Sequence, residues 1–161
     1  MDQEKAHEIE FRVRWGRRYN ERYARIFRRL HGALYAIQLA GAFAGIAAFF
    51  KKSPDLASSA GLIIAVAIIM DIVLKPAEKA AIASSIRGNY LHLFRERKKL
   101  TPDEIESEIS RLQEKGELAD IECLRNLVHN EVLLEMGYGK KQFSDYRAKV
   151  SVLGKLAKIV A

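Results

Sequence analysis

Apolar residues fill two stretches of nineteen positions each, and only five residues separate them. Residues 32–50 contain no charged side chain, and residues 56–74 contain one, Asp71. At about 1.5 Å of rise per residue, a helix of this length extends roughly 28 Å, close to the ~30 Å hydrocarbon core of a bilayer. The pattern therefore predicts two membrane-spanning helices, which the connection 51–55 joins into a tight antiparallel hairpin.

The positions before the first stretch follow a helical period. Residues 4–31 place apolar side chains such as Ile9 and Val13 mostly at spacings of three and four, and eight arginines occupy much of the remainder. This pattern predicts a basic amphipathic helix. Such a helix either lies in the headgroup layer of a membrane or runs straight on into the first span.

The positions after the second stretch are helical as well. The segments predicted to be helices are, in order, 77–100, 102–115, 117–136 and 139–161. Thr101 and Glu104 form a capping box ahead of the second of these, with Pro102 at its first position. The last segment spaces its apolar residues by three and four over three heptads, one heptad short of a coiled-coil assignment. No segment has the alternation of a strand, so we expect an all-α chain.

Basic residues near the spans predict the topology. Nine Lys and Arg lie in residues 1–31 and seven in 75–100, against two in the connection. The positive-inside rule then places both termini in the cytoplasm and the turn 51–55 outside. We expect a multi-pass protein of the cell inner membrane. The first stretch follows 31 residues rich in charge, whereas a secretory signal has a short leading region, so it is predicted to be a span. We expect three parts: an amphipathic helix 1–31, a transmembrane hairpin 32–74, and a cytoplasmic helical domain 75–161.

Overall composition adds a charge pattern. The chain has 161 residues and a net charge of +7. Residues 101–138 carry a charge of −7, whereas the segments before and after them, 75–100 and 139–161, each carry +5. We therefore expect the acidic block to pair with a basic block of the same chain or of a second copy. The single cysteine, Cys123, excludes a disulfide framework within one chain.

Polar residues within the spans are the first candidates for function. Asp71 either pairs with Lys75 one turn later or belongs to an acidic ring at the inner mouth of a pore. Gln38 shares a face with Gly41 and Gly45, a small-residue pattern that lets membrane helices approach closely. This face either packs against a neighbouring helix or lines a water-filled path. Under both interpretations one hairpin leaves faces uncovered, so we expect a homo-oligomer.

Two other groups of residues have alternative interpretations. Phe49 and Phe50 end the first span, either as an interfacial anchor or as a hydrophobic gate at the outer mouth. A basic cluster follows the second span, together with aromatic residues on which bases stack. It either binds a nucleotide or oligonucleotide or is a solvated, lipid-facing or acid-paired run of charge. Its members are Arg87, Arg95, Arg97, Lys98 and Lys99.

Catalytic and metal chemistry has no motif in this sequence. The four histidines lie on different predicted helices, and His129 with Glu122 lacks a third ligand. No nucleophile–base pair, glycine-rich phosphate loop or zinc spacing occurs. We therefore expect no enzyme activity, no metal and no cofactor, and no duplex DNA as a partner.

The order of these features resembles a known family. An arginine-rich helix with Trp15 enters the first span. A short turn and a second span follow, then an exit at residues 75–80 (KPAEKA) and a helix with Tyr90, Leu91 and Leu93. This arrangement, over roughly residues 10–136, resembles the SLATT proteins, which are SMODS- and SLOG-associating two-transmembrane effectors of prokaryotic defence.

The resemblance implies an oligomeric membrane effector, here expected as a tetramer, that forms a gated ion-conducting pore. It also implies control by a nucleotide signal from a partner nucleotidyltransferase, with growth arrest or death of phage-infected cells as the result. Two rival functions stay open from the sequence. The hairpin is either only the anchor of a scaffold or sensor that recruits a soluble partner, or part of a holin-like lysis protein.

Overall fold

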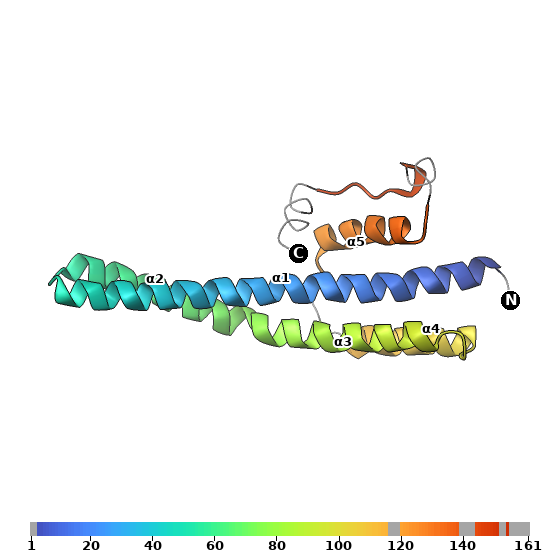
Figure 1. Cartoon of the computed structure of the whole chain (residues 1–161), viewed down its shortest axis with the longest axis horizontal. Coiled ribbons are helices and arrows are strands. Elements are labelled where there is room, and N and C mark those ends of the chain that lie inside the picture. The colour runs from blue at the N-terminus through green and yellow to red at the C-terminus, as the bar shows by residue number, and fades with distance from the viewer. Residues whose placement is uncertain (1–2, 116–119, 139–143, 152–153, 155–161) are drawn as a thin grey trace. The chain divides into compact units, whose positions relative to one another are not determined.

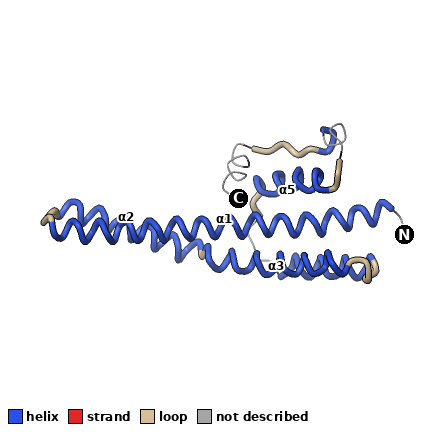
Figure 2. Tube along the Cα trace, viewed as in Figure 1, coloured by secondary structure: helices blue, strands red, loops and turns tan. Residues whose placement is uncertain are grey.

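The computed structural model describes residues 3–115, 120–138, 144–151 and 154. The order of the helices along the chain is α1 (Gln3–Phe50), α2 (Pro54–Leu74), α3 (Pro76–Glu96), α4 (Pro102–Lys115) and α5 (Glu122–Glu135), as labelled in Figure 1. No strand occurs in this part of the chain, as the colouring of Figure 2 also shows. The prediction of an all-α fold is therefore confirmed for the described residues.

Helix α1 joins the predicted leading helix and the first apolar stretch into one continuous helix of 48 residues. Of the two alternatives for residues 4–31, the chain thus adopts the one in which the helix runs straight on. The amide of Ser53 donates to the carbonyl oxygen of Ala48 at 3.1 Å, which closes the helix end. Helix α2 then begins at Pro54. Proline is tolerated at the first position of a helix, because an amide there would have no partner within the helix.

Both ends of α2 have a lysine in the left-handed conformation. Lys52 has φ of 52° and Lys75 has φ of 45°, and in the described chain they are the only residues other than glycine with positive φ. The amide of Lys75 donates to the carbonyl oxygen of Asp71 at 3.0 Å, and α3 begins at the next residue, the buried Pro76. These conformations separate α2 from its neighbours, because a right-handed helix cannot pass through them.

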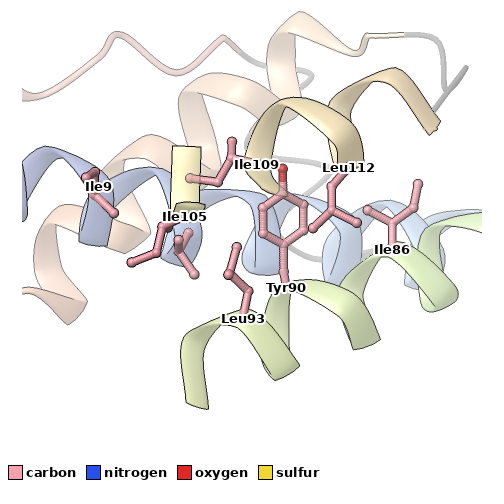
Figure 3. Packing of buried hydrophobic residues seen from close by; sticks show 8 residues of the cluster. Ile9, Ile86, Tyr90, Leu93, Ile105, Ile109 and Leu112 are labelled. Carbon is pink, nitrogen blue, oxygen red and sulfur yellow. The ribbon is translucent and has the colours of Figure 1, made fainter. Parts of the chain in front are cut away.

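The chain forms two compact units, which share α1 and α3. We call Met1–Ile26 with Ala80–Ala161 the helical domain, and Phe27–Lys79 the hairpin unit. The leading half of α1 therefore belongs with the helices that follow the second apolar stretch. Apolar side chains of α1, α3 and α4 form the core of the helical domain (Figure 3), namely Ile9, Val13, Ile86, Tyr90, Leu93, Ile105, Ile109 and Leu112.

Close contact between α1 and α3 requires a glycine. A Cβ atom at Gly16 would lie 2.4 Å from the Tyr90 ring, well inside van der Waals contact. Figure 3 shows that the Tyr90 ring extends from α3 toward Ile109 and Leu112 of α4. Gly16 thus makes room for the aromatic ring around which the three helices pack.

The predicted capping box starts α4 as expected. The amide of Thr101 donates to Glu104 Oε2 at 2.7 Å, and the amide of Glu104 donates to Thr101 Oγ1 at 3.4 Å. These bonds satisfy amides that have no partner within the helix. The backbone amide of Thr101 also holds the pKa of the Glu104 carboxyl below its usual value.

The helix predicted over 139–161 is wrong for part of its length. Residues 144–146 form a helical turn, but residues 147–151 are not helical; 139–143, 152–153 and 155–161 lie outside the described residues. The buried side chain of Asn130 binds Ala148 twice, donating to its carbonyl oxygen and accepting from its amide, both at 2.9 Å. Because these backbone groups bond to α5, they are not available for a local helix.

The hairpin unit buries mostly small residues, with Leu34 also buried, and leaves most large apolar residues exposed. Helix α2 runs antiparallel to the second half of α1, and the buried positions of α2 are Ala60 and Ala67. A Cβ atom at Gly41 of α1 would lie 2.6 Å from Ile64 Cγ1 of α2, so this glycine sets the close approach of the pair.

The outer surface of the hairpin unit is apolar. Sixteen of the nineteen exposed large apolar side chains in the described chain lie between Tyr35 and Val73. Only 11% of the most apolar window of each helix is buried, whereas a core helix of a soluble protein is mostly buried. Two helices are therefore long enough and apolar enough to cross a membrane.

Candidate functional site

A histidine and an aspartate lie in contact within the hairpin unit. His31 Nδ1 of α1 lies 3.0 Å from Asp71 Oδ1 of α2, and the two side chains are 44% and 32% exposed. The predicted ion pair of Asp71 with Lys75 does not form, because Lys75 Nζ instead lies 3.5 Å from Glu78 Oε2. Asp71 is the one charged residue in the two apolar stretches 32–50 and 56–74, and a paired ionisable group in such a stretch marks a candidate site.

The other predicted pore residues, Gln38, Gly41 and Gly45 of α1, differ in how far they are buried. Gly41 is buried against Ile64, while Gln38 and Gly45 are half-buried, and a Cβ atom at Gly45 would meet no atom within 4 Å. For Gly41 this geometry favours packing within the hairpin. Lining of a pore by Gln38, Gly41, Gly45 and Asp71 stays a prediction.

The predicted gate lies at the turn between the two helices. The rings of Phe49 and Phe50 form an edge-to-face pair with centroids 5.9 Å apart, and the residues are 79% and 78% exposed. Their two interpretations, interfacial anchor and gate, both stay predictions.

Of the predicted nucleotide-binding residues, Arg97 and Lys98 line a common cavity, and binding of a nucleotide by the group stays a prediction. Arg87 and Arg95 are exposed on α3, and Lys99 pairs with Glu96 at 2.8 Å. The hydrogen bond to Glu96 and the charge of that carboxylate raise the pKa of Lys99. Arg97 and Lys98 line a cavity of about 400 Å³ whose wall is mostly apolar, with Ile9 and Val13 of α1 among its residues.

A cluster of arginines that the sequence did not single out surrounds one carboxylate. Glu135, the last residue of α5, lies 2.5 Å from Arg17, 3.1 Å from Arg14 and 3.3 Å from Arg18. Glu135 and Arg17 are 23% and 21% exposed, so the contacts are largely screened from water. We call Arg14, Arg17, Arg18 and Glu135 the Glu135 site.

An aromatic ring and a second carboxylate adjoin the Glu135 site. The guanidinium groups of Arg14, Arg17 and Arg97 lie 5.1, 5.5 and 3.8 Å from the centroid of the Phe94 ring. Glu10 Oε1 accepts from Arg14 at 2.6 Å and lies 3.7 Å from Arg97. The hydrogen bond from Arg14 holds the pKa of Glu10 below its usual value.

Further contacts hold α5 along the leading half of α1. Arg22 pairs with Glu131 at 2.6 Å, and the amide of Ile121 donates to the Tyr19 hydroxyl at 3.0 Å. Burial raises the pKa of that Tyr19 hydroxyl. The acidic block therefore pairs with a basic segment of its own chain, as predicted. In the described part of the chain that segment is the N-terminal one, however, and not one of the two basic blocks that flank the acidic block in the sequence.

The spacing of the sequence carried a signal for this contact. Arg14, Arg18 and Arg22 lie four residues apart along one side of a helix, with Arg17 three residues after Arg14, and Glu131 and Glu135 are also four apart. Among the described residues, no group of three or more His, Cys, Asp or Glu side chains is placed to hold a metal ion. Comparison of the chain with protein-family models, curated proteins and solved structures gave no match.

Proposed function

We propose that this chain is a two-span membrane protein of the cell inner membrane, with both termini in the cytoplasm. The exposed apolar surface of the hairpin unit carries this proposal. Sixteen large apolar side chains on one helical pair form an apolar surface of a size that soluble monomers rarely expose to water. A bilayer covers such a surface, and the length of α2, roughly 32 Å at about 1.5 Å per residue, fits its apolar core.

We further propose that several copies, expected as a tetramer, assemble into a gated ion-conducting pore. The polar groups of the hairpin support this proposal, since ionisable and amide side chains in a membrane segment commonly mark an ion path. Asp71 and His31 lie at one end of that segment, and Gln38 lies between them and the turn. An acidic group at a pore mouth favours cations.

The resemblance to SLATT proteins supplies the biological setting of the proposal. In that setting the pore is an effector of anti-phage defence that a partner nucleotidyltransferase controls through a nucleotide, and its opening arrests or kills infected cells. This part rests on analogy of architecture. The rival functions are a membrane-anchored scaffold, which conducts nothing, and a holin-like protein, which makes large unselective lesions.

Ion flux through liposomes that contain the purified full chain tests the pore. We expect cation flux that a nucleotide or short oligonucleotide turns on or off, and we expect Asp71→Asn to reduce the preference for cations without changing assembly. Asp55→Asn is the matched control, because Asp55 lies in the first turn at the other end of α2. Absence of flux from inserted oligomers would favour the scaffold, and leakage of large solutes would favour the holin.

Topology has a separate test in intact cells. In a Cys123→Ser background, Ser53→Cys in the turn is expected to react with a membrane-impermeant maleimide, whereas Ser144→Cys is expected to react only after permeabilisation. Reaction of both cysteines in intact cells would contradict the proposed orientation. Membrane fractionation of the same cells controls for insertion.

A further inference from the structure

The Glu135 site has more positive charge than its carboxylates neutralise. Arg14, Arg17, Arg18 and Arg97 surround Glu135 and Glu10, which leaves an excess of two positive charges before their outer neighbours are counted. Arg18 also lies 3.3 Å from Glu21, at the edge of the cluster. Guanidinium groups that converge on one oxyanion are the arrangement that binds phosphate.

The position of Glu135 is unfavourable without the arginines. Glu135 ends α5, where the helix dipole is negative and a carboxylate is destabilised. The last turn of α5 contains no basic residue that would offset this dipole. Glu135 is therefore held in place by the arginines of α1, and another oxyanion of higher charge would bind those arginines in its place.

We propose that the Glu135 site is a phosphate-binding site, which the chain's own Glu135 carboxylate occupies in this structure. A phosphate monoester or diphosphate would bind to Arg14, Arg17 and Arg18 by displacing Glu135, and α5 would lose its contact at that end. The Phe94 ring, with three guanidinium groups around it, provides an apolar face beside the phosphate. Phosphate binding at this site can be measured whether or not the chain forms a pore. Only the effect of the ligand on gating rests on the proposed function.

The binding test uses inorganic pyrophosphate and the full chain in detergent micelles, with affinity measured by calorimetry. Removal of the competing carboxylate in Glu135→Gln is expected to tighten pyrophosphate binding by about tenfold or more, the value of one charge-assisted hydrogen bond. Arg17→Gln is expected to weaken it by a similar factor. The matched control is Glu131→Gln, which removes a carboxylate one turn earlier that pairs with Arg22 and is expected to change affinity by less than about twofold.

A second measurement needs no variant. In the wild-type chain, pyrophosphate is expected to speed hydrogen exchange in the last turn of α5, and sodium chloride of equal ionic strength is expected to have a smaller effect. Equal affinities for Glu135→Gln and Glu131→Gln, together with equal effects of pyrophosphate and chloride on exchange, would overturn the proposal. The Glu135 contacts would then be purely structural.

A lipid headgroup and a free phosphate share this chemistry, and the test separates the two sources. Vesicles of phosphatidylcholine with 20% phosphatidic acid would be compared with vesicles of phosphatidylcholine and phosphatidylglycerol at equal charge. Selective binding of phosphatidic acid that Arg17→Gln abolishes would identify the headgroup as the source. Pyrophosphate binding without that lipid selectivity would identify a free phosphate. Failure of the pore would leave these results unchanged, so the two proposals can fail independently.

Discussion

In the helical domain the large apolar side chains point inward, whereas in the hairpin unit they point outward. Ile109, Leu124 and Val128 are each fully buried in the helical domain. In the hairpin unit most buried positions are small, as at Ala60 and Ala67, although Leu34 is buried too, and Ile69 and Val73 are more than half exposed. The helical domain thus buries its large apolar side chains, and the hairpin unit has the inverse organisation. The comparison teaches that the two units of one chain place their apolar surface differently, as the proposed membrane hairpin requires.

Truncation of a large apolar side chain is expected to give the largest difference in stability between the two units. Ile109→Ala should cost about 2–5 kcal/mol of unfolding free energy, because it leaves a cavity in the core of the helical domain. Ile69→Ala, on the exposed surface of the hairpin unit, should change stability by less than about 0.5 kcal/mol. Denaturant unfolding in detergent, followed by circular dichroism, measures both. Similar losses for the two variants would break the comparison.

Glycine-to-alanine substitutions in the two units are expected to change stability in opposite directions. Gly16→Ala should destabilise the helical domain by about 1–3 kcal/mol, since the new methyl group overlaps the Tyr90 ring. Gly45→Ala meets no atom within 4 Å and should stabilise its helix by up to about 1 kcal/mol through helix propensity. Thermal unfolding of both variants gives the comparison, with fluorescence of Trp15 reporting on the helical domain. A stabilising Gly16→Ala would contradict the close contact between α1 and α3.

Helix α5 offers a third comparison, between two asparagines of one helix. Asn130→Ala should cost about 1–3 kcal/mol, because it leaves the amide and carbonyl of Ala148 without their partner. Asn126→Ala removes one exposed bond, to the carbonyl oxygen of Lys149, and should cost less than about 1 kcal/mol. Hydrogen exchange at the Ala148 amide is the measurement. Unchanged exchange in Asn130→Ala would show that the contact does not hold residues 147–150 in place.

The smallest expected effect is a pH dependence confined to the helical domain. The pKa of Glu10 is lower in the folded chain than in the unfolded chain, because Arg14 donates to its carboxylate. The stabilisation is therefore present above the unfolded pKa and is lost as the pH falls through the lower, folded value. Glu10 is one-third exposed, so solvent screening limits the effect to below about 1 kcal/mol.

Variants of Glu10 test this dependence. Glu10→Gln should flatten the fall in stability at pH values below the usual carboxyl pKa, relative to wild type. Glu8→Gln, at an exposed position on the same turn, serves as the control. A control that flattens the curve equally would assign the effect to overall charge.

Local patterns allowed the elements to be predicted, because helix periodicity and capping depend on residues close in sequence. The capping box at Thr101 and the apolar stretches are of this kind. The charge blocks also predicted that the acidic segment would bind a basic one, although they did not select Glu135 as the residue that three arginines contact.

Contacts between distant segments account for what could not be predicted. Asn130 binds Ala148, 18 residues later, and this bond replaces the expected helix. Asp71 contacts His31, 40 residues earlier, whereas the local pattern offered Lys75 as one of its alternatives. In each case a partner from another segment competes with a local one, and spacing along a single helix carries no information about that competition.

The left-handed lysines at Lys52 and Lys75 fix the length of α2 at 21 residues. If α2 continued past Lys75, Lys75 would have to adopt the right-handed helical conformation. That conformation is disfavoured for a residue that precedes a proline, and Lys75 precedes Pro76. Ser53 precedes Pro54 in the same way at the other end. As the proposed span, α2 therefore cannot gain a turn in a thicker membrane, and a change of tilt or a local deformation of the lipid has to accommodate the mismatch. The tilt of the proposed span is therefore expected to change with the thickness of the bilayer.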